Sequence, residues 1–122
     1  MKRIFVLLFF LTTLTAYATD YYVSSSGDDQ SDGRSESTAW KTISKVNSSF
    51  SFIQAGDRIL FRRGDSFYGC LTVTSSGESG NHIFIGAYGT GKKPVITGMT
   101  NITSWINEGN GIYSSTISHE SD

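Results

Sequence analysis

The feature that most constrains this chain is the regular spacing of short apolar runs within residues 55–98. Four runs open at Ile59, Leu71, Ile83 and Val95, each twelve residues after the one before it. Glycine-rich turns separate the runs, and apolar residues within a run recur at every second position, which is the period of a β-strand. This constant step of strand and turn predicts that one simple β unit is repeated along the chain.

Two arrangements of β-strands satisfy this spacing. In a flat antiparallel sandwich, each strand pairs with the next one along the chain. In a solenoid, two successive strands belong to one turn of the coil, and every second strand stacks in parallel. The solenoid would pair Ile59 with Ile83. It would likewise pair Leu71 with Val95. The periodicity by itself leaves both arrangements open.

The first segment, residues 1–18, is predicted to be a signal peptide. Lys2 and Arg3 form a basic start, residues 4–11 are unbroken apolar sequence, and Ala18 ends a small-residue cleavage motif. The apolar run is shorter than the roughly 20 residues that a membrane-spanning helix needs. We therefore expect a secreted protein, extracellular, at the cell surface or in the periplasm, with no membrane contact after signal cleavage.

Charge and cysteine content narrow the function classes. The formal net charge is −1, and loss of Lys2 and Arg3 with the signal would bring it to about −3, which argues against a nucleic-acid partner. Cys70 is the only cysteine, so no internal disulfide can form, and we expect it to be a small buried hydrophobe. Nothing in the composition indicates an oligomeric state.

After the signal, the chain divides into two parts. Residues 19–55 hold a predicted strand at residues 21–23, an aspartate-rich loop and one helix. Residues 56–122 hold the repeated β units. The last strand-like run, residues 112–117, is followed by no capping element, so we expect a truncated product.

One helix is predicted, from Ser37 or Thr38 to Val46. Either hydroxyl can accept a hydrogen bond as the residue that caps the helix N-terminus. Ala39, Ile43 and Val46 then fall on one face of the helix, which predicts that this face packs against a core.

A set of short motifs along the mature chain is familiar as a group. It comprises Tyr21-Tyr22-Val23, Gly27-Asp28-Asp29, Asp32-Gly33, Ala39-Trp40, Gly56-Asp57-Arg58-Ile59-Leu60-Phe61, Gly64-Asp65, Tyr68-Gly69, Tyr88-Gly89 and Pro94-Val95-Ile96. In these motifs the chain resembles the N-terminal end of secreted right-handed parallel β-helix proteins, the pectate-lyase-like superfamily. The resemblance implies an all-β fold, with a capping helix over the first coils of a parallel β-helix that is incomplete at its C-terminus.

The resemblance also implies a class of function. The superfamily includes polysaccharide lyases, glycoside hydrolases and non-catalytic surface proteins. We expect the N-terminal part of a carbohydrate-active protein that acts on extracellular polysaccharide, as a lyase or a hydrolase, and most simply as a lyase. The family carries its catalytic side chains on middle coils, so we assign no catalytic residue here and expect this fragment alone to be inactive. A non-catalytic adhesion or carbohydrate-binding β-helix protein and a small stand-alone β-sandwich binding module remain the alternatives.

Three aspartates in the loop form a candidate calcium site. Asp28, Asp29 and Asp32 supply the carboxylate oxygens that calcium prefers, and their spacing partly imitates an EF-hand loop. Ala39 stands where that loop needs a bidentate glutamate. A solvated turn held by bonds from side chains to backbone is the favoured interpretation.

Trp105 and Tyr113 are the candidate contacts for carbohydrate, because aromatic faces pack well on sugar rings. Both lie near the polar run at residues 107–110. Four charged residues flank the apolar run that opens at Ile59. They are interpreted as a solvated rim and not as a binding patch for acidic polysaccharide. They are Asp57, Arg62, Arg63 and Asp65.

Overall fold

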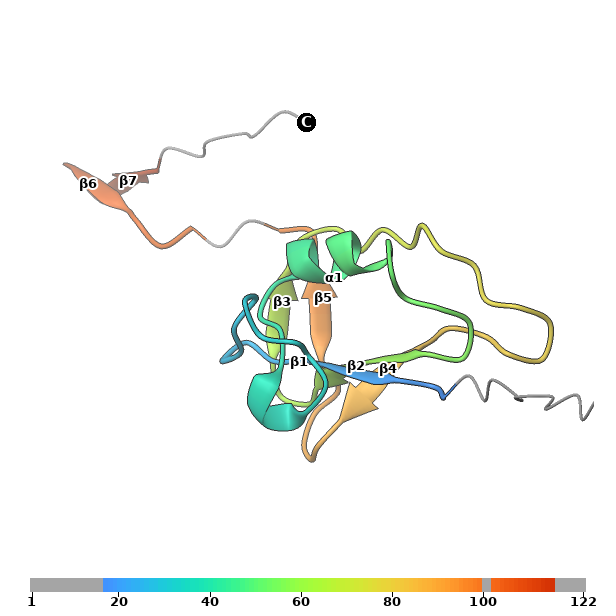
Figure 1. Ribbon diagram of the computed structural model, residues 1–122. Helices are drawn as coiled ribbons and strands as arrows, with labels where there is room; N and C mark the ends of the chain where they lie inside the picture. Colours follow the sequence, from blue (N-terminus) through green and yellow to red (C-terminus); the bar gives the residue numbers. More distant parts are fainter. Residues whose placement is uncertain (1–16, 100–101, 116–122) are drawn as a thin grey trace, which may run out of the picture.

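The computed structural model describes residues 17–99 and 102–115 of the chain (Figure 1). The described part is mostly β with one short α-helix, so the prediction of an all-β fold is confirmed at this level. The elements are β1 (Asp20–Val23), the 3₁₀ helix η1 (Glu36–Thr38), α1 (Ile43–Ser49), β2 (Arg58–Arg62), β3 (Ser66–Tyr68), β4 (Phe84–Tyr88), β5 (Val95–Thr97), β6 (Ile106–Gly109) and β7 (Ile112–Ser114). The predicted signal peptide lies outside the described residues, apart from its last two positions. In the described ranges, no helix is long and apolar enough to cross a bilayer.

Alternate strands of the repeating region pair in parallel. β2 lies between β1 and β4 in a three-stranded sheet, and β3 pairs with β5 in a second sheet. The predicted stacking of every second strand is therefore confirmed, and antiparallel pairing of successive strands is wrong for this region. Figure 1 shows β3 and β5 side by side, with β1, β2 and β4 running across the same body.

The pairing partners differ from those that the twelve-residue spacing predicted. Ile59 pairs with Ile85, and not with Ile83. Val95 pairs with Ser66, and not with Leu71. Paired residues are therefore 26 positions apart in the first sheet (β2 with β4) and 29 apart in the second (β3 with β5). The extra residues lie in the long loop between β3 and β4 and in the turn before β5.

The predicted strand that opens at Leu71 does not form. A side chain of α1 bonds to the backbone groups that a neighbouring strand would otherwise pair with. Asn47 of α1 donates through Nδ2 to the Cys70 carbonyl at 2.8 Å, and its Oδ1 accepts from the Thr72 N–H at 2.9 Å. One amide thus satisfies the two backbone groups that a paired strand would satisfy. Leu71 still packs against the core, but Cys70 is exposed, which corrects the prediction that it is buried.

Helix α1 begins later than predicted. Thr42 is its N-cap, and the Thr42 hydroxyl accepts a hydrogen bond from the Lys45 N–H at 3.1 Å. Ser37 and Thr38 belong instead to η1, which Ser35 caps through its side chain. The single predicted helix is therefore two short helices.

Trp40 separates these two helices because its backbone is extended and pairs with β1. The Trp40 N–H donates to the Tyr22 carbonyl at 2.8 Å, and the Trp40 carbonyl accepts from the Ser24 N–H at 2.8 Å. A residue held in this bridge cannot also continue a helix. Ala39 is consequently buried beside η1 and does not lie on the face of α1.

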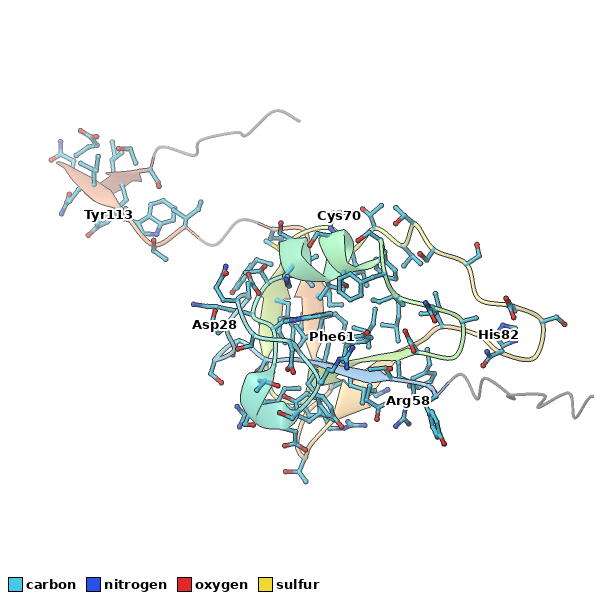
Figure 2. All side chains as sticks on the ribbon, viewed as in Figure 1. Asp28, Arg58, Phe61, Cys70, His82 and Tyr113 are labelled. Atoms are coloured by element: carbon cyan, nitrogen blue, oxygen red, sulfur yellow. The ribbon has the colours of Figure 1, made fainter. Side chains whose placement is uncertain are left out.

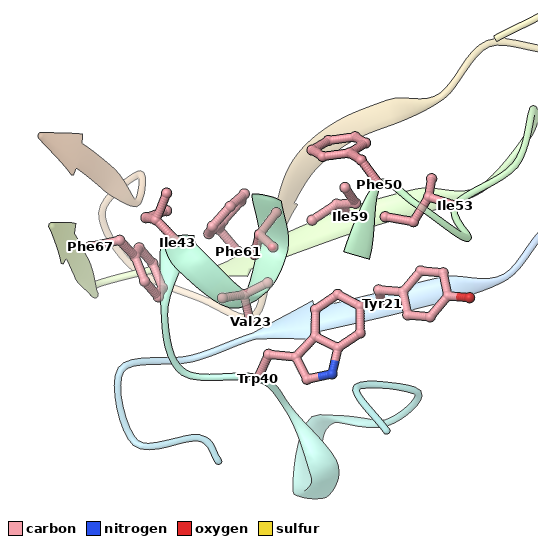
Figure 3. Close-up of a cluster of buried hydrophobic side chains, with 10 residues drawn as sticks. Tyr21, Val23, Trp40, Ile43, Phe50, Ile53, Ile59, Phe61 and Phe67 are labelled. Carbon is pink, nitrogen blue, oxygen red and sulfur yellow. The ribbon is translucent and has the colours of Figure 1, made fainter. Parts of the chain in front are cut away.

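The core lies between β1, β2 and α1 (Figure 3). Its buried side chains are Tyr21, Val23, Trp40, Ile43, Val46, Phe50, Ile53, Ile59, Phe61 and Phe67. The Trp40 ring stacks on Tyr21 with centroids 5.0 Å apart, and its Nε1 donates to the Ser31 carbonyl at 3.0 Å. The prediction that the helix packs against a core is confirmed for Ile43 and Val46, which are buried against this cluster.

The glycine at position 33 is required by this packing. Gly33 has a φ of +73°, and a Cβ there would lie 2.4 Å from the Trp40 ring. Only glycine accommodates both the left-handed backbone and the close approach of the indole.

Strands β6 and β7 form an antiparallel hairpin. Asn110 and Gly111 connect them, with φ values of 52° and 78°, as a type I′ turn requires. A bulge between Asn107 and Gly109 interrupts the ladder.

Candidate functional site

The outward face of the β1-β2-β4 sheet carries a row of aromatic and charged side chains. Because side chains alternate along a strand, Ile59 and Phe61 point into the core while Leu60 and Arg62 point outward. Arg62 pairs in register with Tyr88 on β4. The outward residues at the carboxyl ends of these parallel strands therefore meet on one side of the molecule.

Two tyrosines pack together on this face. The rings of Tyr22 and Tyr88 meet edge to face, with centroids 5.1 Å apart. Gly86, which lies opposite Leu60, contributes no side chain, and a Cβ there would lie 2.3 Å from the Phe84 ring. Leu60 is buried, although it points away from the core. This packing fixes Tyr88 at the edge of an adjacent pocket.

A polar pocket of about 320 Å³ opens beside Tyr88, at the carboxyl ends of β1, β2 and β4. Residues from the loop after β1, from η1 and from the last positions of β2 and β4 line it. They are Ser24, Ser26, Gly27, Glu36, Ser37, Arg62 and Tyr88. Hydroxyl, carboxylate and guanidinium groups are thus brought together from four separate segments of the chain.

Hydrogen bonds hold the pocket wall in place. Asp65, in the turn after β2, accepts from the Ser24 hydroxyl at 3.2 Å and from the Ser25 N–H at 2.9 Å. On the opposite side, a capping box between Ser35 and Thr38 orders η1, which carries Glu36. The polar groups of the pocket are therefore positioned before any ligand arrives.

The electrostatics of the pocket are balanced. Burial raises the pKa of the Tyr88 phenol, and the charge of Glu36 raises it further, so the phenol is neutral and can donate a hydrogen bond. Arg62 lies 3.5 Å from the Ser26 hydroxyl. The ion pair between Arg58 and Asp20 is the one salt bridge within the described residues, so the guanidinium of Arg62 keeps donors for a ligand.

The pocket brings together groups that can form hydrogen bonds with a ligand. Most glycoside hydrolases place two carboxyl groups on either side of the scissile bond. Glu36 is the one carboxylate in the lining of this pocket. The arrangement suits recognition of a hydroxyl-rich molecule.

The four charged residues that were interpreted as a solvated rim have separate roles. Asp57 is buried, and its carboxylate accepts from the backbone N–H groups of Thr19 and Gln54, each at 2.9 Å. Asp57 thus ties the start of β1 to the turn before β2. For Asp57 the rim interpretation is corrected, because its carboxylate is buried and structural. Arg62 is exposed, as a rim residue would be, and Asp65 bonds to the loop after β1.

The loop aspartates bond to backbone, as the solvated-turn interpretation predicts. Asp28 accepts from the Gln30 N–H at 2.9 Å, and Asp32 accepts from the Arg34 N–H at 3.0 Å. In the described ranges, no group of three or more acidic, histidine or cysteine side chains is arranged to hold a metal ion. Calcium binding by Asp28, Asp29 and Asp32 stays a prediction.

Asp29 joins the loop to the start of α1. Its Oδ1 accepts from the backbone N–H groups of Lys41 and Thr42 at 2.7 and 3.0 Å, and its Oδ2 accepts from the Thr42 hydroxyl at 2.6 Å. Partial burial alone would raise the pKa of Asp29, but these hydrogen bonds and the charge of Lys45 lower it below its ordinary value.

Trp105 and Tyr113 lie on the hairpin (Figure 2 labels Tyr113), and both are 58% exposed. Tyr113 of β7 pairs with Asn107 of β6, and Trp105 directly precedes β6. The structure thus places both predicted carbohydrate contacts at the exposed hairpin, and their contact with sugar stays a prediction.

Ser24, Glu36 and Arg62 lie far apart in the sequence and were not predicted to meet, and Tyr88 was predicted only as part of a motif. One local pattern could have indicated the position of Arg62. Inward and outward positions alternate over residues 58–62, which places Arg62 on the outward face. The partners of Arg62 depend on register and on the position of η1, which the spacing did not reveal.

Comparison with known proteins places these features in context. Over 90 residues the chain is 41% identical to a lacto-N-biosidase of Bifidobacterium longum subsp. longum, a match that covers 69% of this chain and 6% of that protein. No family model matches the sequence.

Solved structures give a consistent picture. A GH136 lacto-N-biosidase from Eubacterium ramulus superposes with a TM-score of 0.57 at 41% identity, covering 62% of this chain and 12% of that one. The protein XylC, solved in complex with xylose, superposes with a TM-score of 0.60 at 25% identity, covering 78% of this chain and 14% of that one. The chain is thus similar to a small segment of much longer proteins, of which the lacto-N-biosidases are glycoside hydrolases.

Proposed function

We propose that this chain forms the first coils of a right-handed parallel β-helix in a secreted glycoside hydrolase that acts on extracellular glycans. The observation that carries the proposal is the 41% identity with segments of two lacto-N-biosidases. The parallel stacking of β4 on β2 and of β5 on β3 supports the β-helix, because a solenoid builds its core in this way.

Hydrolysis replaces elimination as the reaction that we favour. The sequence analysis took a lyase as the simplest case, but the relatives at 41% identity are named as biosidases. By the same likeness, we propose a glycan that contains lacto-N-biose as the substrate. Such a hydrolysis needs an acid and a second carboxylate as nucleophile or base.

The chain itself is proposed to support this chemistry and not to perform it. Glu36 stands without a second carboxylate in the lining of the pocket at the carboxyl ends of the strands. The catalytic pair would then belong to further coils of a longer protein, in agreement with the small share of the relatives that this chain spans. The N-terminal signal at residues 1–18 would direct that protein out of the cytoplasm.

The test is an assay of the complete polypeptide that the gene encodes. It is incubated with a glycan that ends in lacto-N-biose, and the released disaccharide is quantified beside a reaction with residues 19–122 alone. We expect release by the complete polypeptide and none by the shorter chain. If the complete polypeptide binds the glycan and releases nothing, a carbohydrate-binding or adhesion protein replaces the hydrolase.

A further inference from the structure

We propose that the pocket lined by Ser24, Glu36, Arg62 and Tyr88 binds one neutral sugar residue of a glycan. The choice of ligand class rests on the proposed function. The pocket itself is an observation of the fold, because the register of β2 and β4, the loop after β1 and η1 together build it.

The size of the pocket fits a single sugar unit. Its volume of about 320 Å³ is near the lower limit of small-molecule sites, which span roughly 300–1,000 Å³. A pocket of this size holds one ring. Because it opens to solvent at the ends of the strands, the rest of a glycan chain can extend out of it.

The polar groups match the hydroxyls of a sugar. Each sugar hydroxyl can donate one hydrogen bond and accept others, so a ring needs both kinds of partner. Glu36 supplies acceptors, Arg62 supplies donors, and the serine hydroxyls supply both. Hydrogen bonds to charged groups are the stronger ones, so Glu36 and Arg62 should contribute most to binding.

The charge balance favours a neutral sugar over an acidic one. The positive charge of Arg62 is opposed by Glu36 in the lining and by Asp65, which bonds to Ser24 behind it. A carboxylated sugar would meet two carboxylates for one guanidinium. A neutral ring avoids that repulsion and still uses every donor and acceptor.

The apolar side of a sugar ring also finds a partner. The ring of Tyr88 lies at the edge of the pocket and is held by its contact with Tyr22 at 5.1 Å. Aromatic rings fixed in this way offer an apolar surface with little loss of conformational freedom on binding. The pocket therefore combines a fixed ring with hydrogen-bonding groups.

Titration of the isotope-labelled protein with galactose, N-acetylglucosamine, xylose and glucuronate, followed by amide NMR, tests the proposal. We expect saturable shifts centred on Ser26 and Gly27 with at least one neutral sugar, and binding of glucuronate at least fivefold weaker. Arg62→Gln and Glu36→Gln should each weaken binding of that neutral sugar about tenfold while the folding midpoint stays within the range of the controls.

Two matched variants serve as controls. Arg63→Gln removes the same charge at the next position, and Glu78→Gln removes a carboxylate from a different pocket. Both should bind the sugar as the parent does. The proposal is overturned if no neutral sugar gives saturable shifts at the pocket, or if the pocket variants and the controls bind equally.

The outcome separates this proposal from the function proposed above. Release of lacto-N-biose without sugar binding at Gly27 would remove only the pocket proposal. Binding at Gly27 without release would keep the pocket and remove the hydrolase.

Discussion

Inward-facing residues are buried at the β1 end of the stacked parallel strands and partly exposed at the β4 and β5 end, although they are register partners in the same sheets. Tyr21, Ile59 and Ile85 are register partners that point inward, yet their exposed fractions are 5%, 0% and 38%. In the second sheet, Phe67 is 3% exposed and its partner Ile96 is 39% exposed. An inward-facing position is therefore buried only where structure covers it on both sides along the stack.

The difference arises from what lies next to each layer. At the first end, α1 and the Trp40 bridge cover β1 and β2 and complete the core. At the other end, within the described residues, β4 and β5 each have one paired edge. The closed end holds the buried core, and the open end exposes apolar side chains of β4 and β5.

The largest expected effect compares two isoleucines on one ladder. Ile59→Ala should lower the free energy of unfolding by about 4 kcal/mol, because it empties a buried site. Ile85→Ala should cost about 1 kcal/mol, since that side chain is already partly in water. Urea denaturation of both variants measures the difference. Equal losses would show that the open end is covered in solution.

A second comparison uses two glycines that share a left-handed backbone. Gly33→Ala should cost about 3 kcal/mol, because the new methyl group meets the Trp40 ring and φ is +73°. Gly64→Ala has a similar φ of +87° but nothing within 4 Å, so it should cost only about 1 kcal/mol. Thermal unfolding of the pair separates packing at the closed end from backbone strain. Similar losses would mean that Trp40 is not packed as described.

The smallest effect concerns the carboxylate that joins the loop to α1. Asp29→Asn should cost about 2 kcal/mol at pH 7, because a charged acceptor of three hydrogen bonds is lost. Asp28→Asn should cost less than about 0.5 kcal/mol, as an exposed group with one local bond. Chemical denaturation of both variants at neutral pH provides the measurement.

The same residue predicts a dependence on pH. The pKa of Asp29 is lower in the folded protein than in the unfolded chain. Its contribution is therefore fully present above the unfolded value near 3.8 and is lost as pH falls through the folded value. The parent should lose more stability than Asp29→Asn as the pH falls from 5 toward the acid limit. Parallel curves for the two proteins would contradict this assignment.

Local patterns in the sequence predicted most of the strands. The alternation at Ile59 and Phe61 gave β2, and the runs after Ile83 and Val95 gave β4 and β5. The hairpin turn at Asn110-Gly111 carried an equally local signal that the sequence analysis did not use. These features were accessible because each depends on residues that are neighbours in the chain.

Two predicted elements are wrong because residues far away in the sequence bond to the same backbone groups. At Leu71 no strand forms, and the side chain of Asn47 bonds to the backbone there. The first half of the predicted helix does not join α1, because Trp40 pairs with β1. Local secondary-structure propensity cannot predict such cases, since the hydrogen bonds that form come from segments far away along the chain.

By itself, the sequence determined that short strands would alternate with glycine turns and that every second strand could stack, because side-chain period and turn chemistry act over a few residues. Only the tertiary structure decided that Ile59 lies opposite Ile85, that one end is closed by Trp40, and that Glu36 meets Arg62 in a pocket. The physical reason is register. The length of each coil is set by contacts between loops and α1, and that length determines which side chains share a face.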